Sequence, residues 1–327
     1  MDYDEIERLT DTVKAENDFV GKIKSEVGRV VVGQEALIDR ILISYLSEGH
    51  VLLEGLPGLA KTLTIRAFAR AIDTSFQRVQ FTPDLLPADL IGTRIYNPRE
   101  LDFFTKKGPI FTNLLLADEI NRAPAKVQSA LLQCMEEKQV TIGEETHSLE
   151  KPFMVLATEN PIEQEGTYPL PEAQLDRFFM KVLVDYPSRQ EEKEILNRFS
   201  EINVNNVNKV MPPDRIAKKA DIVQKIYIDE KLIDYIVTIV GETRNPTRKE
   251  LKKYIEFGAS PRASIALMKA SRCIAFIRGR GFVTPDDIKE IGADVLRHRI
   301  ILSYEAEADG KMADDVVKML FDSIEVP

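Results

Sequence analysis

HVLLEGLPGLAKT, at residues 50–62, is an apolar run followed by a glycine-containing loop and the pair Lys61-Thr62. The helix-like segment LTIRAFARAI comes directly after it, at residues 63–72. A strand, a loop, Lys-Thr and a helix in this order predict a phosphate-binding loop, because backbone N–H groups and the helix N-terminus then face phosphate oxygens. In such a loop Lys61 reaches the β- and γ-phosphates and the Thr62 hydroxyl binds Mg²⁺. The alternative is a chance turn between a strand and a helix.

The loop departs from the strict phosphate-loop pattern at one position. That pattern has glycine immediately before the lysine, whereas this chain has Ala60. Alanine tolerates right-handed helical backbone angles but not a positive φ. We therefore expect residue 60 to enter the following helix in the right-handed region.

A second apolar run, LLLADE at residues 114–119, ends in two adjacent carboxylates. Such a run is typical of a strand in a buried parallel sheet, where ligands bind beyond the carboxyl ends of the strands. There Asp118 is placed to hold Mg²⁺, and Glu119 is placed to polarise the water that attacks a γ-phosphate. A solvated acidic turn is the alternative.

The rest of the chain divides by pattern around this segment. Apolar residues from Ile6 to Val27 recur at spacings of three, four and seven, which predicts one long N-terminal helix. Between residues 50 and 184 five strand-like runs (HVLLE, FQRVQF, LLLA, FMVLA and MKVLV) alternate with helical segments and predict a mostly parallel α/β sheet. The predicted parts are an N-terminal helix (1–30), an α/β core (31–187), a linker region (188–213) and a helical domain (214–327).

Composition excludes several classes of protein. The 327 residues are 44% hydrophobic with a formal charge of −9, so a disordered chain or a generic binder of nucleic acid is not expected. The two cysteines are far apart and are expected to pack as small apolar residues. No apolar run is long enough to span a membrane and the first residues do not read as a secretory signal, so we expect a cytoplasmic protein.

Taken together, the motifs resemble the AAA+ ATPases, and within them the MoxR family of the helix-2-insert group. The resemblance covers nearly the whole chain and is carried by GLPGLAKT (55–62), LLLADEINRAPAKVQSALLQCMEE (114–137), FMVLATENP (153–161), PEAQLDRF (171–178) and ASPRAS (259–264). It implies a P-loop AAA+ core of three αβα layers with a parallel sheet, followed by a smaller all-helical lid domain. It also implies Mg²⁺-dependent hydrolysis of ATP to ADP and phosphate by a homo-oligomer, a hexamer, with a chaperone-like action on a protein partner. Proteins with von Willebrand factor A domains are common partners in this family.

The resemblance assigns a role to individual residues. Asn160 matches the polar sensor that orients the attacking water, Arg177 the arginine finger that reaches a neighbouring subunit's nucleotide, and Arg262 the second sensor. Arg122 resembles a further intersubunit sensor. The implied catalytic residues are Lys61, Glu119, Asn160, Arg177 and Arg262. The implied nucleotide-binding residues are Val32, Gly33, Gln34, Gly55, Leu56, Pro57, Gly58, Leu59, Ala60, Lys61, Thr62, Leu63 and Asp118, with Thr62 and Asp118 on Mg²⁺.

Each of these assignments has a plainer alternative. Asn160-Pro161 is also a common turn dipeptide, and Arg177 could form a salt bridge with Asp176 or another nearby acid. Arg262 could be a surface arginine. Ser260 and Pro261 are nevertheless typical of a helix start, and a cation in the first helical turn is unfavourable unless an anion is near.

Two insertions and two rival functions complete the prediction. Residues 92–112 and 139–150 read as hairpins that face the central pore or the substrate in the family, or else are surface hairpins without a role. A nucleotide-gated scaffold with little turnover is one rival, although Glu119 argues against it. A nucleic-acid translocase is the other, and the acidic net charge argues against that.

Overall fold

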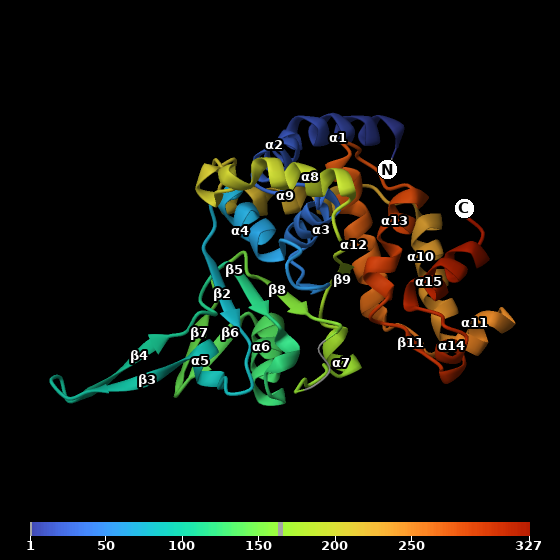
Figure 1. Ribbon diagram of the computed structural model, residues 1–327. Coiled ribbons are helices and arrows are strands. Elements are labelled where there is room, and N and C mark those ends of the chain that lie inside the picture. Colours follow the sequence, from blue (N-terminus) through green and yellow to red (C-terminus); the bar gives the residue numbers. More distant parts are fainter. Residues whose placement is uncertain (1, 163–165) are drawn as a thin grey trace.

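A parallel sheet of five strands, in the order β2-β5-β8-β1-β9, forms the centre of the first half of the chain (Figure 1). The computed structural model describes residues 2–162 and 166–327. The strands are β1 (Val51–Glu54), β2 (Phe76–Gln80), β5 (Leu114–Asp118), β8 (Met154–Glu159) and β9 (Met180–Leu183). All four neighbouring pairs are parallel. The five apolar runs predicted as strands are thus confirmed.

Helices cover both faces of this sheet and give it three layers. Leu53 and Leu116 point into one hydrophobic cluster, while their neighbours Leu52 and Leu115 point into another. The first cluster is completed by α2 (Asp18–Gly28), α3 (Glu35–Leu46) and α4 (Lys61–Ala71), and the second by α5 (Pro87–Ile91) and α6 (Ala125–Glu137). Because successive side chains of a strand point to opposite faces, the apolar runs bury both faces. The αβα core is therefore as predicted.

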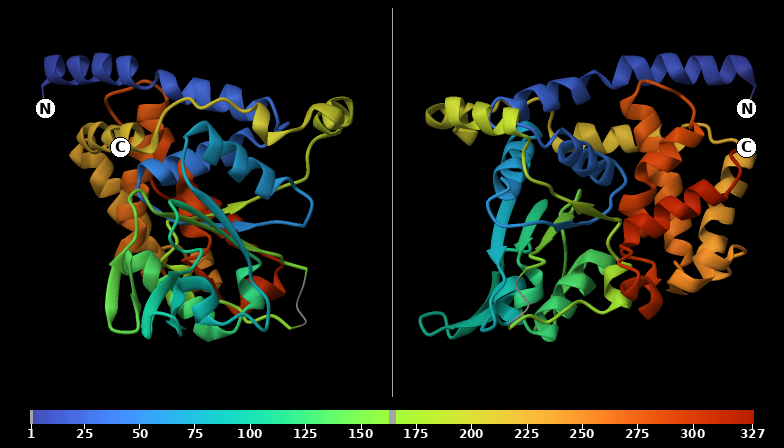
Figure 2. Two further views of the ribbon diagram at one scale, coloured as in Figure 1. Left: turned by 90° about the vertical axis from the view of Figure 1, so that its left-hand side faces the viewer. Right: turned by 45° about the vertical axis from the view of Figure 1, so that its right-hand side comes forward.

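The second half of the chain is mainly helical and lies beside the β9 edge of the sheet (Figures 1 and 2). Its helices are α9 (Pro213–Lys225), α10 (Glu230–Arg244), α11 (Lys249–Tyr254), α12 (Pro261–Ile277), α13 (Pro285–Leu296), α14 (Tyr304–Ala308) and α15 (Ala313–Ser323). One detail corrects the expectation of an all-helical lid. The short strand β10 (Ile255–Phe257) pairs antiparallel with β11 (Ile301–Leu302).

The segment between the two halves is largely helical in short pieces. It contains α8 (Arg189–Arg198), η2 (Phe199–Glu201) and η3 (Val204–Asn206). Ser188 begins α8, since its side chain accepts from the Glu191 N–H and the Glu191 carboxylate accepts from the Ser188 N–H.

The N-terminal segment differs from the prediction of one long helix. It forms two helices, α1 (Tyr3–Glu16) and α2, that meet at Asn17. The Asn17 side-chain amide donates to the carbonyls of Phe276 (3.2 Å) and Ile277 (3.3 Å) at the end of α12. These are carbonyls that a helix end leaves without an intrahelical partner. A contact with a distant helix, invisible in the local apolar spacing, thus lies where the N-terminal helix is interrupted.

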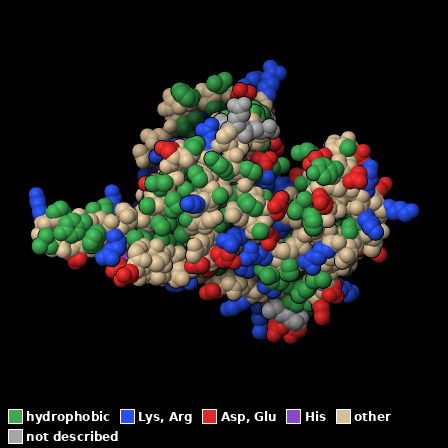
Figure 3. Space-filling model, turned by 90° about the horizontal axis from the view of Figure 1, so that it is seen from below, with side chains coloured by type: hydrophobic (Ala, Val, Ile, Leu, Met, Phe, Trp, Pro, Cys, Tyr) green, Lys and Arg blue, Asp and Glu red, His purple; other side chains and the backbone are tan. Residues whose placement is uncertain are grey.

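Both predicted hairpins are confirmed. β3 (Gly92–Asn97) pairs with β4 (Asp102–Lys107), and β6 (Gln139–Ile142) pairs with β7 (Glu145–Ser148). The β3–β4 hairpin projects away from the core, and hydrophobic side chains gather on it (Figure 3). Exposed members are Tyr96, Leu101, Phe103 and Phe104. Across the parts of the chain that the structure describes, no helix is long and apolar enough to cross a membrane.

His50, just before β1, is buried and makes stability depend on pH. The Val155 N–H donates to its Nδ1 (3.0 Å), so the ring proton lies on Nε2, which faces the Met135 carbonyl (3.2 Å). Burial lowers the pKa of His50 to about 4. An unfolded histidine titrates near 6.5, so this stabilisation is complete above that pH and is lost as pH falls toward 4.

We expect acidification to pH 4 to remove about 3 kcal/mol of the free energy of unfolding through His50 alone. Urea unfolding between pH 7 and pH 4 measures this loss. His50→Gln keeps a donor and an acceptor without a titrating ring, and should flatten the pH dependence. His147→Gln, on the β6–β7 hairpin, is the matched control. An equal slope in His50→Gln and wild type would contradict the assignment.

Candidate active site

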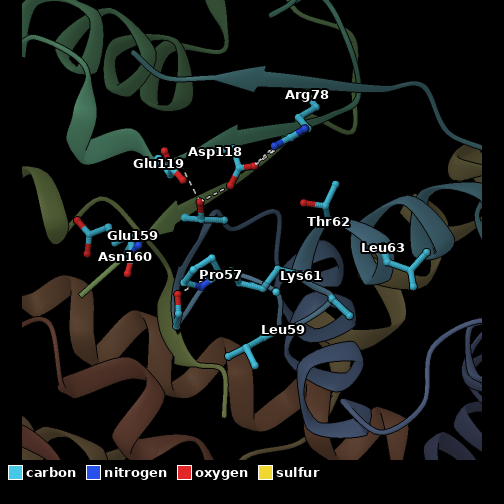
Figure 4. Close-up of a pocket in the computed structure, with 14 residues that line it drawn as sticks. Pro57, Leu59, Lys61, Thr62, Leu63, Arg78, Asp118, Glu119, Glu159 and Asn160 are labelled. Atoms are coloured by element: carbon cyan, nitrogen blue, oxygen red, sulfur yellow. Dashed lines mark hydrogen bonds and ion pairs between the residues drawn. The ribbon is translucent and has the colours of Figure 1, made fainter. Parts of the chain in front are cut away.

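The predicted phosphate loop borders a cavity of about 400 Å³ at the carboxyl ends of β1, β5 and β8. Eleven of the predicted site residues line it, among them Lys61, Thr62, Asp118, Glu119 and Asn160. The loop and α4 supply one wall, and the two carboxylates lie opposite (Figure 4). The full lining is Gly55, Pro57, Gly58, Leu59, Ala60, Lys61, Thr62, Leu63, Arg78, Asp118, Glu119, Thr158, Glu159 and Asn160.

The Lys61 side chain folds back onto the first residues of the phosphate loop. Its ammonium donates to the carbonyls of Gly55 and, at 3.3 Å, Leu56. Burial lowers the pKa of Lys61, while the negative charges of Asp118 and Glu119 act in the opposite direction. The first amides of α4 have no partner within the helix. An ammonium, a hydroxyl and helix N-terminal amides are donors that suit phosphate oxygens, so this wall fits a nucleoside triphosphate.

Asp118 is held on both carboxylate oxygens. The Thr158 hydroxyl donates to Oδ1 (2.6 Å), and Arg78 donates to Oδ2 through Nε (2.9 Å) and Nη2 (2.6 Å). Thr158 lies on β8, the neighbour of β5 on one side, and Arg78 lies on β2, its neighbour on the other side. These contacts fix the orientation of the carboxylate, as an oxygen ligand for Mg²⁺ requires. Thr62 lines the opposite wall of the same cavity.

Glu119 leaves β5 with a φ of 56°, in the left-handed region. Its N–H donates to the Thr158 hydroxyl (2.8 Å), and its Oε2 accepts from the Gln80 side-chain amide (2.8 Å). Arg122 pairs with the same oxygen at 3.2 Å. A non-glycine residue in this region costs on the order of 1 kcal/mol and is common at functional sites. The turn aims the carboxylate into the cavity beside Asp118.

Asn160 directly follows β8 and is buried. Its Oδ1 accepts from the Ile162 N–H (3.2 Å), and its side chain lines the cavity. The local turn given as the alternative is thus present, and the amide also faces the site. Beside it, burial raises the pKa of Glu159, and the Lys181 ammonium lies 3.9 Å from that carboxylate.

Arg177 and Arg262 lie outside the loop cavity. They border a second cavity of about 210 Å³, between the end of α6 and α12. Arg177 donates to the Leu132 carbonyl (3.1 Å) and pairs with Glu136 (3.2 Å), and Arg262 pairs with the same carboxylate (2.7 Å). Ser260 begins α12 as predicted and accepts from the Arg262 N–H. The salt bridge with a nearby acid, given above as the alternative, is present for Arg177.

The residues expected near an adenine ring are also apart from the loop cavity. Val32 and Gln34 line a neighbouring cavity of about 420 Å³, together with Tyr186 and Glu191. Gly33 lies so close to the Glu191 carboxylate that an added Cβ would come within 2.6 Å of it. The structure thus places this group beside the beginning of α8 rather than beside Lys61.

Comparison with known proteins bears on these features. Residues 50–180 match the family described as "ATPase family associated with various cellular activities (AAA)", and residues 248–320 match the AAA lid domain. Chaperone MoxR1 of Mycobacterium tuberculosis is 47% identical over 92% of this chain and 81% of its own. The chain belongs to the MoxR family of AAA+ ATPases. Uncharacterized protein YeaC of Bacillus subtilis is 42% identical over 94% of this chain and 95% of its own.

A solved structure places the whole MoxR-family chain in the same fold. The crystal structure of a Cytophaga hutchinsonii protein, presented as an ATPase, superposes with a TM-score of 0.90. It is 47% identical and covers 99% of this chain and 98% of its own. Because 99% of this chain is covered, the likeness includes both the core and the lid.

Several residues around the MoxR-family site were not found from sequence. Arg78, Gln80 and Thr158 hold the two carboxylates, yet none of the three residues was assigned a role. The sequence did show that each residue lies at or near the end of a predicted strand. It did not show which strands are neighbours, and Gln80 lies opposite Asp118 only because β2 pairs with β5.

Ala60 corrects the expectation of a right-handed entry into α4. Its φ is 56° and its ψ is 15°, which is left-handed. Glycine avoids the steric cost of about 1–2 kcal/mol that alanine has in this region. It also loses more conformational entropy on folding than alanine, which lowers the free energy of unfolding by about 0.5–1 kcal/mol. We therefore expect Ala60→Gly to stabilise this MoxR protein by about 0.5 kcal/mol. Chemical denaturation measures this, and Ala69→Gly, inside the same helix, should destabilise; a loss of stability in Ala60→Gly would contradict the argument.

Proposed function

We propose that this chain is a Mg²⁺-dependent ATPase that works as a homo-oligomer, a hexamer, in which Arg177 and Arg262 of one subunit serve the nucleotide of the next. One observation carries the proposal. The loop cavity contains a phosphate-binding wall and two fixed carboxylates, while both arginines lie on a separate cavity of the same subunit. A neighbouring subunit is the natural source of the cations that such a site needs.

The residues of the loop cavity divide the chemistry between them. Lys61 and the N-terminal amides of α4 would hold the phosphates, and Thr62 and Asp118 would hold Mg²⁺. Bound ATP and Mg²⁺ supply the phosphoanhydride bond and neutralise charge on the phosphate oxygens. Glu119 accepts the proton of the attacking water, and the Asn160 amide orients that water. Thr158 keeps the two carboxylates in place through its hydrogen bonds.

The work done with this energy is, in our proposal, the remodelling or activation of a protein partner in the cytoplasm. The relative named Chaperone MoxR1 supports a chaperone-like role. A von Willebrand factor A domain protein is the candidate partner, and the exposed aromatic residues of the β3–β4 hairpin offer a contact surface for a protein. With a net charge of −9, the chain is not expected to act on nucleic acid.

The proposal is tested by phosphate release from ATP with Mg²⁺ at increasing protein concentration, together with sedimentation. Specific activity should rise with concentration as rings form, because each site is completed by a neighbour. ATP binding without turnover at every concentration would support the scaffold instead. Activity that appears only with DNA and falls steeply with salt would support the translocase.

A further inference from the structure

Glu136, in the last turn of α6, contacts both arginines at once. Its Oε1 lies 2.7 Å from Nη2 of Arg262, and its Oε2 lies 3.2 Å from Nη2 of Arg177. One carboxylate oxygen thus serves each guanidinium group. Arg177 belongs to the α/β core and Arg262 begins the lid helix α12. The carboxylate therefore joins the two halves of the molecule at the tips of these two side chains.

A second carboxylate, that of Asp176, links the backbone segments from which the two arginine side chains extend. Asp176, the residue before Arg177, accepts from the Ser260 hydroxyl (2.8 Å) two residues before Arg262. Its other oxygen accepts from Arg299 Nε (2.8 Å), which is almost fully buried. Asp176 thus fixes where the two chain segments meet, and Glu136 fixes where the two guanidinium groups meet.

This arrangement contributes little to stability and keeps cationic groups available. The side chains of Glu136, Arg177 and Arg262 are 46%, 33% and 47% exposed, and ion pairs at such positions typically contribute less than about 1 kcal/mol. Asp176 also lies 3.9 Å from Arg262 Nη1 but is paired with Arg299, so the three guanidinium groups and the two carboxylates together retain a net positive charge. Arg177 and Arg262 each have five N–H donors, of which Glu136 and the Leu132 carbonyl engage only a few. The remaining donors suit a phosphate group.

We propose that Glu136 is a positioning residue that holds Arg177 and Arg262 as one two-arginine receptor for the terminal phosphate of a nucleotide bound to the neighbouring subunit. This inference rests on the proposed function, since it requires that both arginines act across an interface. Without the carboxylate the two like charges repel, and the lid arginine is no longer set against the core arginine. A displacement of about 1 Å at a catalytic group can lower a rate about 100-fold.

Glu136→Gln is therefore expected to lower turnover about 10- to 100-fold while nucleotide affinity within the subunit is unchanged. Affinity is measured with a fluorescent ATP analogue on each variant alone, and folding by thermal unfolding. Glu137→Gln is the matched control on the same helix, since the Glu137 carboxylate accepts from Gln133. Glu136→Asp, which keeps the charge on a shorter side chain, should retain more activity than Glu136→Gln and replaces it as the test variant if the glutamine variant does not fold.

Mixing inactive variants separates this inference from the proposed function. Glu119→Gln lacks the base but carries intact arginines, and Arg177→Ala lacks an arginine but carries an intact loop cavity. Their mixture should regain phosphate release; if it does not, the shared site is absent and both proposals fail together.

Glu136→Gln should behave as the arginine variant does. Mixed with Glu119→Gln it should regain activity, and mixed with Arg177→Ala it should not. If the first pair of variants recovers but Glu136→Gln recovers only with Arg177→Ala, the residue acts on its own subunit's site and the inference is wrong. Turnover equal to that of Glu137→Gln would also overturn it while leaving the proposed function intact.

Discussion

Replacing Glu119 with glutamine is expected to stop phosphate release while ATP remains bound. A positioned general base contributes about 10²- to 10⁴-fold to a rate, and an amide cannot accept the proton of the attacking water. The amide oxygen can still accept from Gln80, which contacts the carboxylate at 2.8 Å, so the turn after β5 should persist. Phosphate release and the binding of a fluorescent ATP analogue, measured on one preparation, distinguish the two effects.

The control for Glu119→Gln is Glu144→Gln, which removes an equal charge at the exposed turn between β6 and β7. It should behave as wild type. Turnover in Glu119→Gln within a few-fold of wild type would mean that another group activates the water. Loss of nucleotide binding would instead mean that the carboxylate is needed to build the cavity.

Arg177→Ala is expected to lower turnover on the order of 10³-fold, the effect typical of an arginine finger. The loop cavity does not include this side chain, so nucleotide affinity of the isolated subunit should be unchanged. Steady-state turnover at a protein concentration that favours rings, with binding measured on dilute protein, checks both expectations. Arg189→Ala, which alters an exposed arginine of α8, is the matched control.

A large fall in nucleotide affinity would contradict this assignment for Arg177, because it would place the arginine on its own subunit's ATP. A turnover equal to that of Arg189→Ala would leave the arginine with a structural role, in which its contact with the Leu132 carbonyl holds α6.

The parts of the structure that could be predicted depend on neighbouring residues in sequence. The five strands follow from apolar runs of strand length, and the phosphate loop follows from a motif in which strand, loop and helix are consecutive. The start of α12 was predicted for the same reason, since Ser260 and Pro261 are local signals. None of these required knowledge of what packs against them.

The parts that could not be predicted depend on contacts between distant segments. The interruption at Asn17 is matched to carbonyls that lie 259 and 260 residues later in the chain. Arg78 and Gln80 reach the carboxylates only because β2 is the neighbour of β5. The joint pairing of Arg177 and Arg262 with Glu136 depends on where the lid rests against α6. Ala60 is a different case, because a left-handed residue at that point runs against the steric preference of alanine.

The two N-terminal helices have a mechanical consequence (Figure 2). α2 packs against α4, the helix that begins with the phosphate loop, while α1 contacts the lid, where Thr10 accepts from the Gly281 N–H (3.1 Å). Asn17 fastens the joint between them to the end of α12. The two helices therefore link the lid to α4. A movement of the lid relative to the core must either displace α4 or break these contacts.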